Sequence, residues 1–308
     1  MTGVKSRSQL IKKDFISNKH VYLMAIPMLT YYILFHYGAM YGAIIAFKDF
    51  RPSKGILRSS WAGLTYFRMF FTDVYFLRII LNTLAINALN LAFGFPMPII
   101  FALLLNEIRN KFFKRTVQTI SYLPYFISTM VICGMIIDFV ARDGIITKFF
   151  TLFGLKTNTS LLLNAKYFRP IYITSEIWAH MGWGAVIYIS ALTGIDPQLY
   201  EAAEIDGAKK FRQLLHITLP GIIPTIIIML ILRLGSMMNV GFEKIILLYN
   251  TNIYSTADVI SSYVYRRGLL EFNFSYGAAV GLFNSVVNFT LVFMSNWISR
   301  KVGETSLF

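Results

Sequence analysis

Residues 201–220 read EAAEIDGAKKFRQLLHITLP and form a charged island between two long apolar runs. Alanine packs well in helices, glycine allows a tight turn, and proline suits the first turn of a new helix. The island therefore predicts a helix, a turn and a second helix that leads into the apolar run beginning at residue 221. The residues that set this order are Glu201, Ala202, Ala203, Asp206, Gly207, Ile217, Leu219 and Pro220.

The rest of the chain is strongly apolar. Hydrophobic residues make up 56% of the 308 residues, charged residues make up 14%, and the mean hydropathy is +0.58. These values exceed those of a soluble domain of this length. The longest polar segments, of about 30 residues, are too short for a self-supporting soluble core. The composition predicts an integral membrane protein with a single transmembrane domain.

Six stretches are long and apolar enough to cross a bilayer, which takes about 20 helical residues. We therefore predict an all-α integral membrane protein with six transmembrane helices. The second of them is long for one crossing and holds Pro96 and Pro98, so we predict a kink in it or a helical extension past the membrane. The six stretches are 21–47, 76–105, 117–140, 170–194, 221–241 and 276–298.

The net charge of +14 raises the question of a nucleic-acid partner. The basic residues, however, are scattered through the loops between apolar runs, with no recognised nucleic-acid motif, so no such partner is predicted. The single Cys133 excludes an internal disulfide and a cysteine-based metal cluster. The first apolar stretch is longer than the core of a signal peptide and is interpreted as a membrane anchor.

The charged island resembles the cytoplasmic loop of the permease subunits of binding-protein-dependent ABC importers. That loop carries EAA, three residues, glycine, nine residues, isoleucine, any residue and Leu-Pro, and residues 201–220 match every fixed position. The chain is most similar to the maltose-permease-like branch that imports complex polysaccharides or oligosaccharides. The segments that carry this likeness are YGAIIAFKDF (41–50), WAGLTYFRMFF (61–71), NVGFEKIILLYN (239–250) and ADVISSYVYRRGL (257–269).

The resemblance implies the partners. The sequence holds no G-x-x-x-x-G-K-[ST] phosphate-binding motif, so a partner must hydrolyse ATP and the chain itself is predicted not to be an enzyme. By resemblance, two ATPase subunits bind ATP and Mg²⁺, a second homologous permease subunit completes the pathway, and a periplasmic or extracellular solute-binding protein delivers a carbohydrate. Residues 195–220 would be a cytoplasmic helix-turn-helix coupling loop in a cleft of the ATPase, with Glu201 paired to a basic group there. The chain itself would bind no cofactor.

The resemblance also implies the orientation of the chain in the cell membrane, with both termini cytoplasmic. Residues 1–20 would be a cytoplasmic tail, 21–298 the six-helix domain and 299–308 a second cytoplasmic tail. In this orientation the inner segments hold 14 Lys and Arg and the outer segments hold 13, so the positive-inside rule is barely obeyed. The outer loops 48–75 and 141–169 are unexpectedly basic, which bears on the charge of the substrate.

Polar residues inside the membrane are candidates for the substrate pathway, because exposing them to lipid is costly. Arg233 would either meet an anionic sugar or form an internal ion pair with Asp138, Glu176 or Glu243. Tryptophan also serves as an interfacial anchor, and asparagine also forms hydrogen bonds between helices. His180 is interpreted as a packed histidine, and no metal site is predicted. The candidate pathway residues are Asn87, Asn90, Tyr122, Glu176, Trp178, Trp183, Arg233, Asn239, Asn284 and Asn288.

The predicted function is that of a permease subunit for an oligosaccharide or polysaccharide, with an acidic, uronate-type oligomer preferred. Three alternatives remain open. One is an ABC permease for another solute such as glycerol phosphate. The second is a stand-alone secondary transporter, although no internal repeat is visible. The third is a membrane-embedded enzyme, which Asp138, Glu176 and His180 support only weakly.

Overall fold

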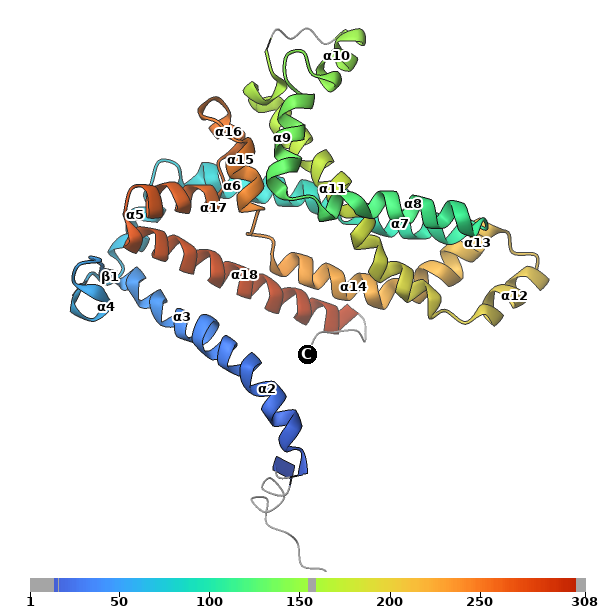
Figure 1. The fold of residues 1–308 in the computed structure, drawn as a ribbon, viewed down its shortest axis with the longest axis horizontal. Helices are drawn as coiled ribbons and strands as arrows, with labels where there is room; N and C mark the ends of the chain where they lie inside the picture. Colours follow the sequence, from blue (N-terminus) through green and yellow to red (C-terminus); the bar gives the residue numbers. More distant parts are fainter. Residues whose placement is uncertain (1–13, 16, 155–158, 303–308) are drawn as a thin grey trace, which may run out of the picture.

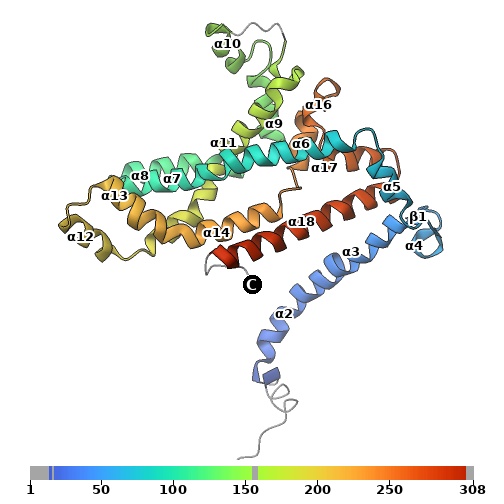
Figure 2. The ribbon, with the colours of Figure 1, turned by 180° about the vertical axis from the view of Figure 1, so that it is seen from behind.

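The computed structural model describes residues 14–15, 17–154 and 159–302, and these residues are almost entirely helical (Figures 1 and 2). The one sheet of the described residues is a short antiparallel pair of strands, β1 (Lys48–Asp49) and β2 (Ser60–Trp61). Most of the predicted cytoplasmic tails, 1–20 and 299–308, lies outside the described residues. The all-α prediction is confirmed.

The first helical run is long and apolar enough to span a membrane. Its first part, α2 (Lys19–Tyr31), stands apart from the other helices (Figure 1) and has no buried residue, whereas its last part, η2 (Tyr41–Phe47), packs against α18 (Phe274–Val302). A short capping segment of one strand pair and two small helices follows this run. The other elements are η1 (Tyr32–Tyr37), α3 (Gly38–Met40), α4 (Gly55–Arg58) and α5 (Thr65–Phe71).

The second helical run, Phe76–Glu107, contains a π-helical turn, η3 (Asn90–Gly94), between α6 (Phe76–Leu89) and α7 (Pro96–Glu107). In this turn the Phe95 N–H donates to the Asn90 carbonyl at 2.9 Å. Proline lacks an N–H and clashes with the preceding turn, and a π-turn directly before Pro96 accommodates both effects. The kink expected from Pro96 and Pro98 stays a prediction.

The third predicted span, 117–140, is not one straight helix. It is divided into α8 (Lys111–Tyr122) with η4 (Leu123–Phe126) and α9 (Thr129–Phe139), and the two parts are bent by 100°. Pro124 lies in η4, and the Ser128 hydroxyl accepts from the Val131 N–H to cap a new helix. Beyond α9, α10 (Ile145–Leu152) projects from the bundle (Figure 1) before η5 (Leu161–Leu163).

The remaining helices form the centre and one end of the bundle. α11 (Ala165–Thr193) packs along α7, and α14 (Leu219–Gly235) packs against α18 (Phe274–Val302). α14 ends six residues before the predicted end of span five, and residues 236–241 are turn and coil. The elements between these long helices are α12 (Pro197–Ile205), α13 (Lys210–Gln213), η6 (Leu214–Thr218), α15 (Phe242–Leu248), η7 (Thr251–Ile253), α16 (Tyr254–Ala257), α17 (Ile260–Val264) and η8 (Tyr265–Leu270).

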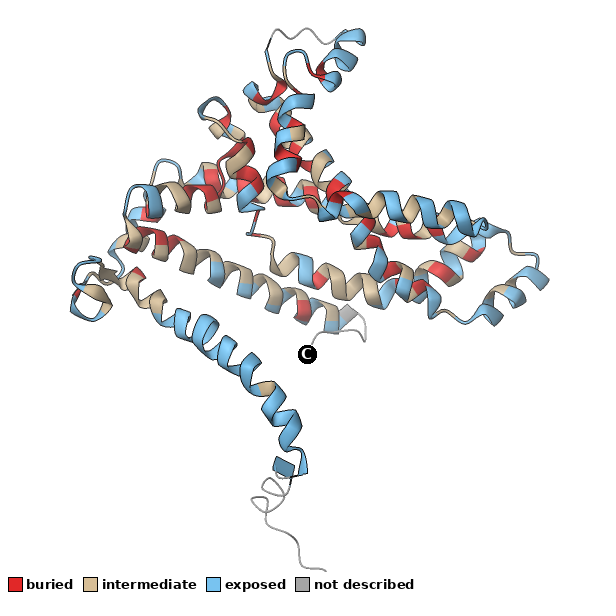
Figure 3. Cartoon of the chain, in the orientation of Figure 1, coloured by how far each residue is buried: buried red, intermediate tan, exposed pale blue. Residues whose placement is uncertain are grey.

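Four helical runs of the described residues are long and apolar enough to cross a membrane, or five if the bent pair of α8 and α9 counts as one span. α11 has the length, but its polar residues, Glu176 and His180 among them, lower its hydropathy. The count of six spans therefore remains a prediction. Buried residues concentrate where α6, α9, α11, α15 and α17 meet, whereas α2 and the helix ends are exposed (Figure 3).

A buried ionic network joins the helices near their junction with α17. The carboxylate of Asp258, fully buried, accepts from Arg266 at 2.7 Å and lies 3.6 Å from Arg78. Asn82 donates to the Asp258 carbonyl at 2.9 Å and accepts from Arg169 at 2.8 Å. Hydrogen bonds and ion pairs compensate part of the desolvation of these groups, although Arg78 Nε, Arg169 Nε and Arg266 Nη1 find no hydrogen-bond partner among the described residues. The network links α6 and α11 to the chain on either side of α17.

Gly277 and Gly281, one turn apart on α18, have different environments. A Cβ added to Gly277 would lie 2.9 Å from the Cα of Gly268 in η8, whereas a Cβ on Gly281 would meet nothing within 4 Å. We expect Gly277→Ala to lower the stability by about 1–3 kcal/mol, the usual cost of overpacking. Gly281→Ala, the matched control, should be neutral or stabilising, because alanine favours the helix. Thermal unfolding of the purified variants in detergent measures both effects, and equal effects would contradict the predicted contact.

Candidate functional site: a helical loop and a polar cavity

The loop at 195–220 begins with a capped helix. The Asp196 carboxylate accepts from the Gln198 N–H at 2.9 Å, and Pro197 occupies the first position of α12. α12 ends at Ile205, and the chain turns at Gly207, which has φ +75°. The Ala208 N–H donates to the Ala203 carbonyl at 2.8 Å and the Gly207 N–H donates to that of Glu204 at 3.1 Å. This pair of bonds is a Schellman motif, which explains why a glycine stands at this position.

The second half of the loop joins the bundle without a break. α13 continues through the π-turn η6 into α14, so Leu219 and Pro220 lie in a helix that is already running. This continuous run corresponds to the predicted second helix that leads into the apolar stretch, and Pro220 lies in the first turn of α14, where the wider π-turn before it accommodates the missing proline N–H. A hydrogen bond of 3.0 Å between the Tyr200 and Thr218 hydroxyls ties α12 to this helix.

The loop lies at one end of the molecule, opposite the segment of β1, α4 and α5 (Figures 1 and 2). Its surface is exposed and mixed in character. Ile205 is 87% exposed, an unusual state for such an apolar side chain. The predicted coupling residues divide into the exposed Glu201, Ala202, Asp206, Gly207 and Pro220 and the half-buried Ala203, Ile217 and Leu219.

A polar cavity of about 440 Å³ lies between η3, α7, α11 and α14. Three of the ten predicted pathway residues line it, namely Asn90, Glu176 and Arg233. His180 and Ser236 add further polar groups to its wall. The π-turn η3 places Asn90 here, and Arg233 reaches the cavity from the last turn of α14.

Glu176 is held from two sides. Its Oε2 accepts from Lys244 Nζ at 2.8 Å, and its Oε1 lies 3.4 Å from His180 Nδ1. The predicted internal ion pair of Arg233 does not form, because no carboxylate of the described residues lies within 4 Å of its guanidinium. Glu176 pairs with Lys244 and not with Arg233. The guanidinium of Arg233 therefore stays free to bind an anion.

An aromatic surface adjoins the cavity through His180. The Trp183 ring stacks on Tyr125 with centroids 4.9 Å apart and an interplanar angle of 10°, and the His180 ring contacts the edge of Tyr125 at 5.8 Å. Tyr122, a predicted pathway residue, packs against Trp183 at 6.4 Å. The close approach of α11 to α8 depends on Gly182, where an added Cβ would lie 2.1 Å from the Ser121 carbonyl oxygen. The rings of Trp183 and Tyr125 remain partly exposed and can stack against the face of a ligand ring.

The other predicted pathway residues lie elsewhere. Asn239 accepts from Asn284 at 2.8 Å and from Asn288 at 3.2 Å, which links the chain after α14 to α18 as interhelical hydrogen bonds do. Asn87 is buried and donates to the Thr83 carbonyl of its own helix. None of these four side chains lines the polar cavity.

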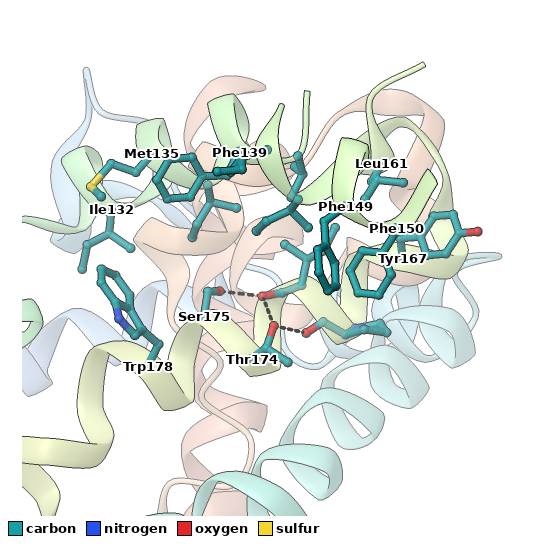
Figure 4. Close-up of a pocket in the computed structure, with 16 residues that line it drawn as sticks. Ile132, Met135, Phe139, Phe149, Phe150, Leu161, Tyr167, Thr174, Ser175 and Trp178 are labelled. Carbon is teal, nitrogen blue, oxygen red and sulfur yellow. Dashed lines mark hydrogen bonds between the residues drawn. The ribbon is translucent and has the colours of Figure 1, made fainter. Parts of the chain in front are cut away.

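Trp178 lines a different cavity, an apolar one of about 850 Å³ between α9, α10 and α11 (Figure 4). The Thr174 and Ser175 hydroxyls in its wall donate to carbonyl oxygens of their own helix, that of Ile171 among them, so they offer the cavity little polarity. This environment suits a hydrophobic neighbour better than a sugar, and Trp178 is separated from the polar cavity.

Three residues of this site, Tyr125, His180 and Lys244, were not among the ten predicted pathway residues. Tyr125 and Lys244 lie in loops or short helices whose position depends on the 100° bend after α8 and on the end of α14. His180 was interpreted as a packed histidine, although its spacing of four residues from Glu176 places both on one helix face. The described residues bring together no group of three or more His, Cys, Asp and Glu side chains able to hold a metal ion.

The comparisons with known proteins agree with this architecture. Residues 94–304 match the family of the binding-protein-dependent transport system inner membrane component. The chain belongs to this family. It is therefore a transport permease with several membrane helices, and the family predicted from the sequence is confirmed.

Individual members of the family are similar over nearly the whole chain. The chain is 43% identical over 305 residues to the polygalacturonan/rhamnogalacturonan transport system permease protein YteP of Bacillus subtilis strain 168, covering 99% of this chain and 94% of that protein. A crystal structure of a bacterial ABC transporter involved in import of the acidic polysaccharide alginate matches with a TM-score of 0.87 and 40% identity, over 95% of this chain and 99% of that one. A second structure, of an alginate transporter with a pentasaccharide-bound periplasmic protein, has a TM-score of 0.88 and 38% identity, over 98% of this chain and 100% of that one.

Proposed function

We propose that this chain is the permease subunit of an ATP-driven importer for acidic oligosaccharides or polysaccharides of the uronate type. The observation that carries the substrate class is the free guanidinium of Arg233 in a cavity that adjoins the stacked rings of Tyr125 and Trp183. Sugars bind through aromatic faces against C–H surfaces and through polar groups on their hydroxyls. An arginine adds bidentate recognition of a carboxylate. Import of alginate and of polygalacturonan by similar transporters supports this assignment.

The partners follow from the family and from the exposed loop. A solute-binding protein delivers the substrate from outside, as the binding-protein-dependent family implies. Two ATPase subunits hold ATP and Mg²⁺ and receive α12, whose Ile205 and Glu201 provide apolar and acidic contacts. A second, homologous permease subunit completes the pathway beside this chain, which has no catalytic role of its own. Both termini then lie in the cytoplasm, on the same side as residues 195–220.

A permease for glycerol phosphate is the second candidate, because a phosphate also suits Arg233. The aromatic surface of Tyr125 and Trp183 favours a sugar ring over so small a solute. A secondary transporter or an enzyme has no observation in its favour, and the loop of 195–220 would have no purpose in either.

Uptake by whole cells tests the proposed substrate class. In a strain that lacks only this chain, we expect uptake of labelled trigalacturonate to fall to background and to return when the wild-type chain is supplied. Glycerol 3-phosphate uptake should be unchanged. Loss of glycerol 3-phosphate uptake with normal trigalacturonate uptake would instead support the second candidate.

A further inference from the structure

Lys244 is a buried cation in a chain segment that the proposed function leaves without a role. Its side chain is 7% exposed and lies on α15, the short helix that follows α14. Its Nζ donates to Glu176 Oε2 at 2.8 Å and to the Tyr172 carbonyl at 3.3 Å, and it lies 4.7 Å from the centre of the Tyr172 ring. A lysine is rarely buried unless it is paired, and each of these contacts compensates its desolvation.

Lys244 does not line the polar cavity but contacts a residue that does, Glu176. The ionisable groups that do line it are Glu176, His180, Tyr188 and Arg233. Glu243, the neighbour of Lys244, is exposed and does not line the cavity.

The charges of the cavity then sum to one positive charge. Glu176 and Lys244 neutralise each other at 2.8 Å, and Arg233 has no carboxylate within 4 Å among the described residues. His180 Nδ1 lies 3.1 Å from the Glu176 carbonyl oxygen and 3.4 Å from its Oε1, within reach of both oxygens, and the ring is counted as neutral in this sum. Without Lys244, the Glu176 carboxylate would offset Arg233 and would repel an anionic ligand.

We infer that Lys244 is a specificity-determining residue: it neutralises Glu176 and so leaves the charge of Arg233 available to select a saccharide that carries a carboxylate. Glu176 can at the same time accept hydrogen bonds from sugar hydroxyls, which a neutral cavity wall would not provide as well. This inference rests on the proposed function and names the residue that sets the preference for an acidic substrate.

Variants that change the charge of Lys244 or Glu176 test the inference. The quantity measured is the ratio of the affinities for an acidic and a neutral trisaccharide. Trigalacturonate and a neutral galactose trisaccharide would be titrated onto the purified whole transporter in nanodiscs. The solute-binding protein is left out, so that its selectivity does not enter. The variants are Lys244→Met, Glu176→Gln, the double variant and Lys244→Arg.

We expect Lys244→Met to lower the preference for trigalacturonate by roughly tenfold or more, as loss of one charge of a buried pair predicts. The double variant, which restores the net charge of Arg233 alone, should return the preference to within about threefold of wild type, since a buried pair replaced together leaves no unpaired charge. Glu176→Gln should keep or raise the preference, and Lys244→Arg should keep it. The order of the four ratios follows the net charge of the cavity.

A structural role alone gives a different pattern. Both single variants would then lose affinity for the two saccharides in parallel, with the ratio unchanged, and this result overturns the inference. The same holds if the double variant recovers stability in a thermal scan but not the preference for trigalacturonate. If the wild-type transporter binds neither saccharide, the proposed function itself is wrong and the inference falls with it.

Discussion

Gly207→Pro in the exposed loop is expected to separate this permease from its ATPase. Gly207 has φ +75°, which proline cannot adopt, and its N–H donates to the Glu204 carbonyl in the Schellman motif. The turn between α12 and α13 would therefore be lost, and α12 would no longer present Glu201 and Ile205 together. We expect the ATPase retained on the purified chain to fall at least about tenfold, the change that 1.4 kcal/mol produces.

Gly207→Ala provides a graded test, because a Cβ at this site meets no atom within 4 Å and only the backbone strain, about 1–2 kcal/mol, remains. The matched control is Gly154→Pro. Gly154 also has a positive φ, +91°, and also follows the end of a helix, α10, and α10 lies far from α12 and α13 (Figure 1). Equal loss of the ATPase in both proline variants would contradict the coupling role of residues 195–220.

Arg233→Gln is the second change with a large expected effect. The substitution keeps a polar group of similar length in the cavity and removes the one charge that we assign to substrate recognition. Loss of a charge-assisted hydrogen-bonded contact costs about 1.5–3 kcal/mol. We therefore expect binding of trigalacturonate to fall by at least about tenfold, with little change in binding of a neutral galactose trisaccharide.

Arg300→Gln is the control for this experiment, because Arg300 is an exposed cation in the last turn of α18. It alters the net charge of the chain by the same amount and should leave both affinities unchanged. If Arg233→Gln weakens the binding of both saccharides equally, Arg233 contributes to the packing of α14 and not to the recognition of a carboxylate.

The loop could be predicted from the sequence because its signals are local. Asp196 caps α12, and Gly207 stands where a left-handed residue is needed, so residue order alone determines the turn. The helical class could likewise be predicted from the long apolar runs. The π-turn η6 directly before α14 could not be predicted, because no local signal distinguishes it from an ordinary helical turn.

The cavity could be predicted only in part, because it depends on contacts between distant segments. Glu176 and Arg233 stood out as charges in apolar runs, which is a local signal. Their partners did not: the pairing of Lys244 with Glu176 depends on where α14 ends at Gly235 and on how α15 returns toward α11. Asn239, Asn284 and Asn288, like Asn90, are polar residues in or next to apolar runs. They form hydrogen bonds with one another, however, and do not line the cavity.

The measurement that tests the central claim most directly is transport by the whole importer in proteoliposomes, with this chain, its permease partner and the ATPases reconstituted together. The account predicts that trigalacturonate enters only when ATP and Mg²⁺ are present on the ATPase side and the solute-binding protein is present on the other. Entry without ATP, or entry of a neutral trisaccharide with no entry of trigalacturonate, would contradict it.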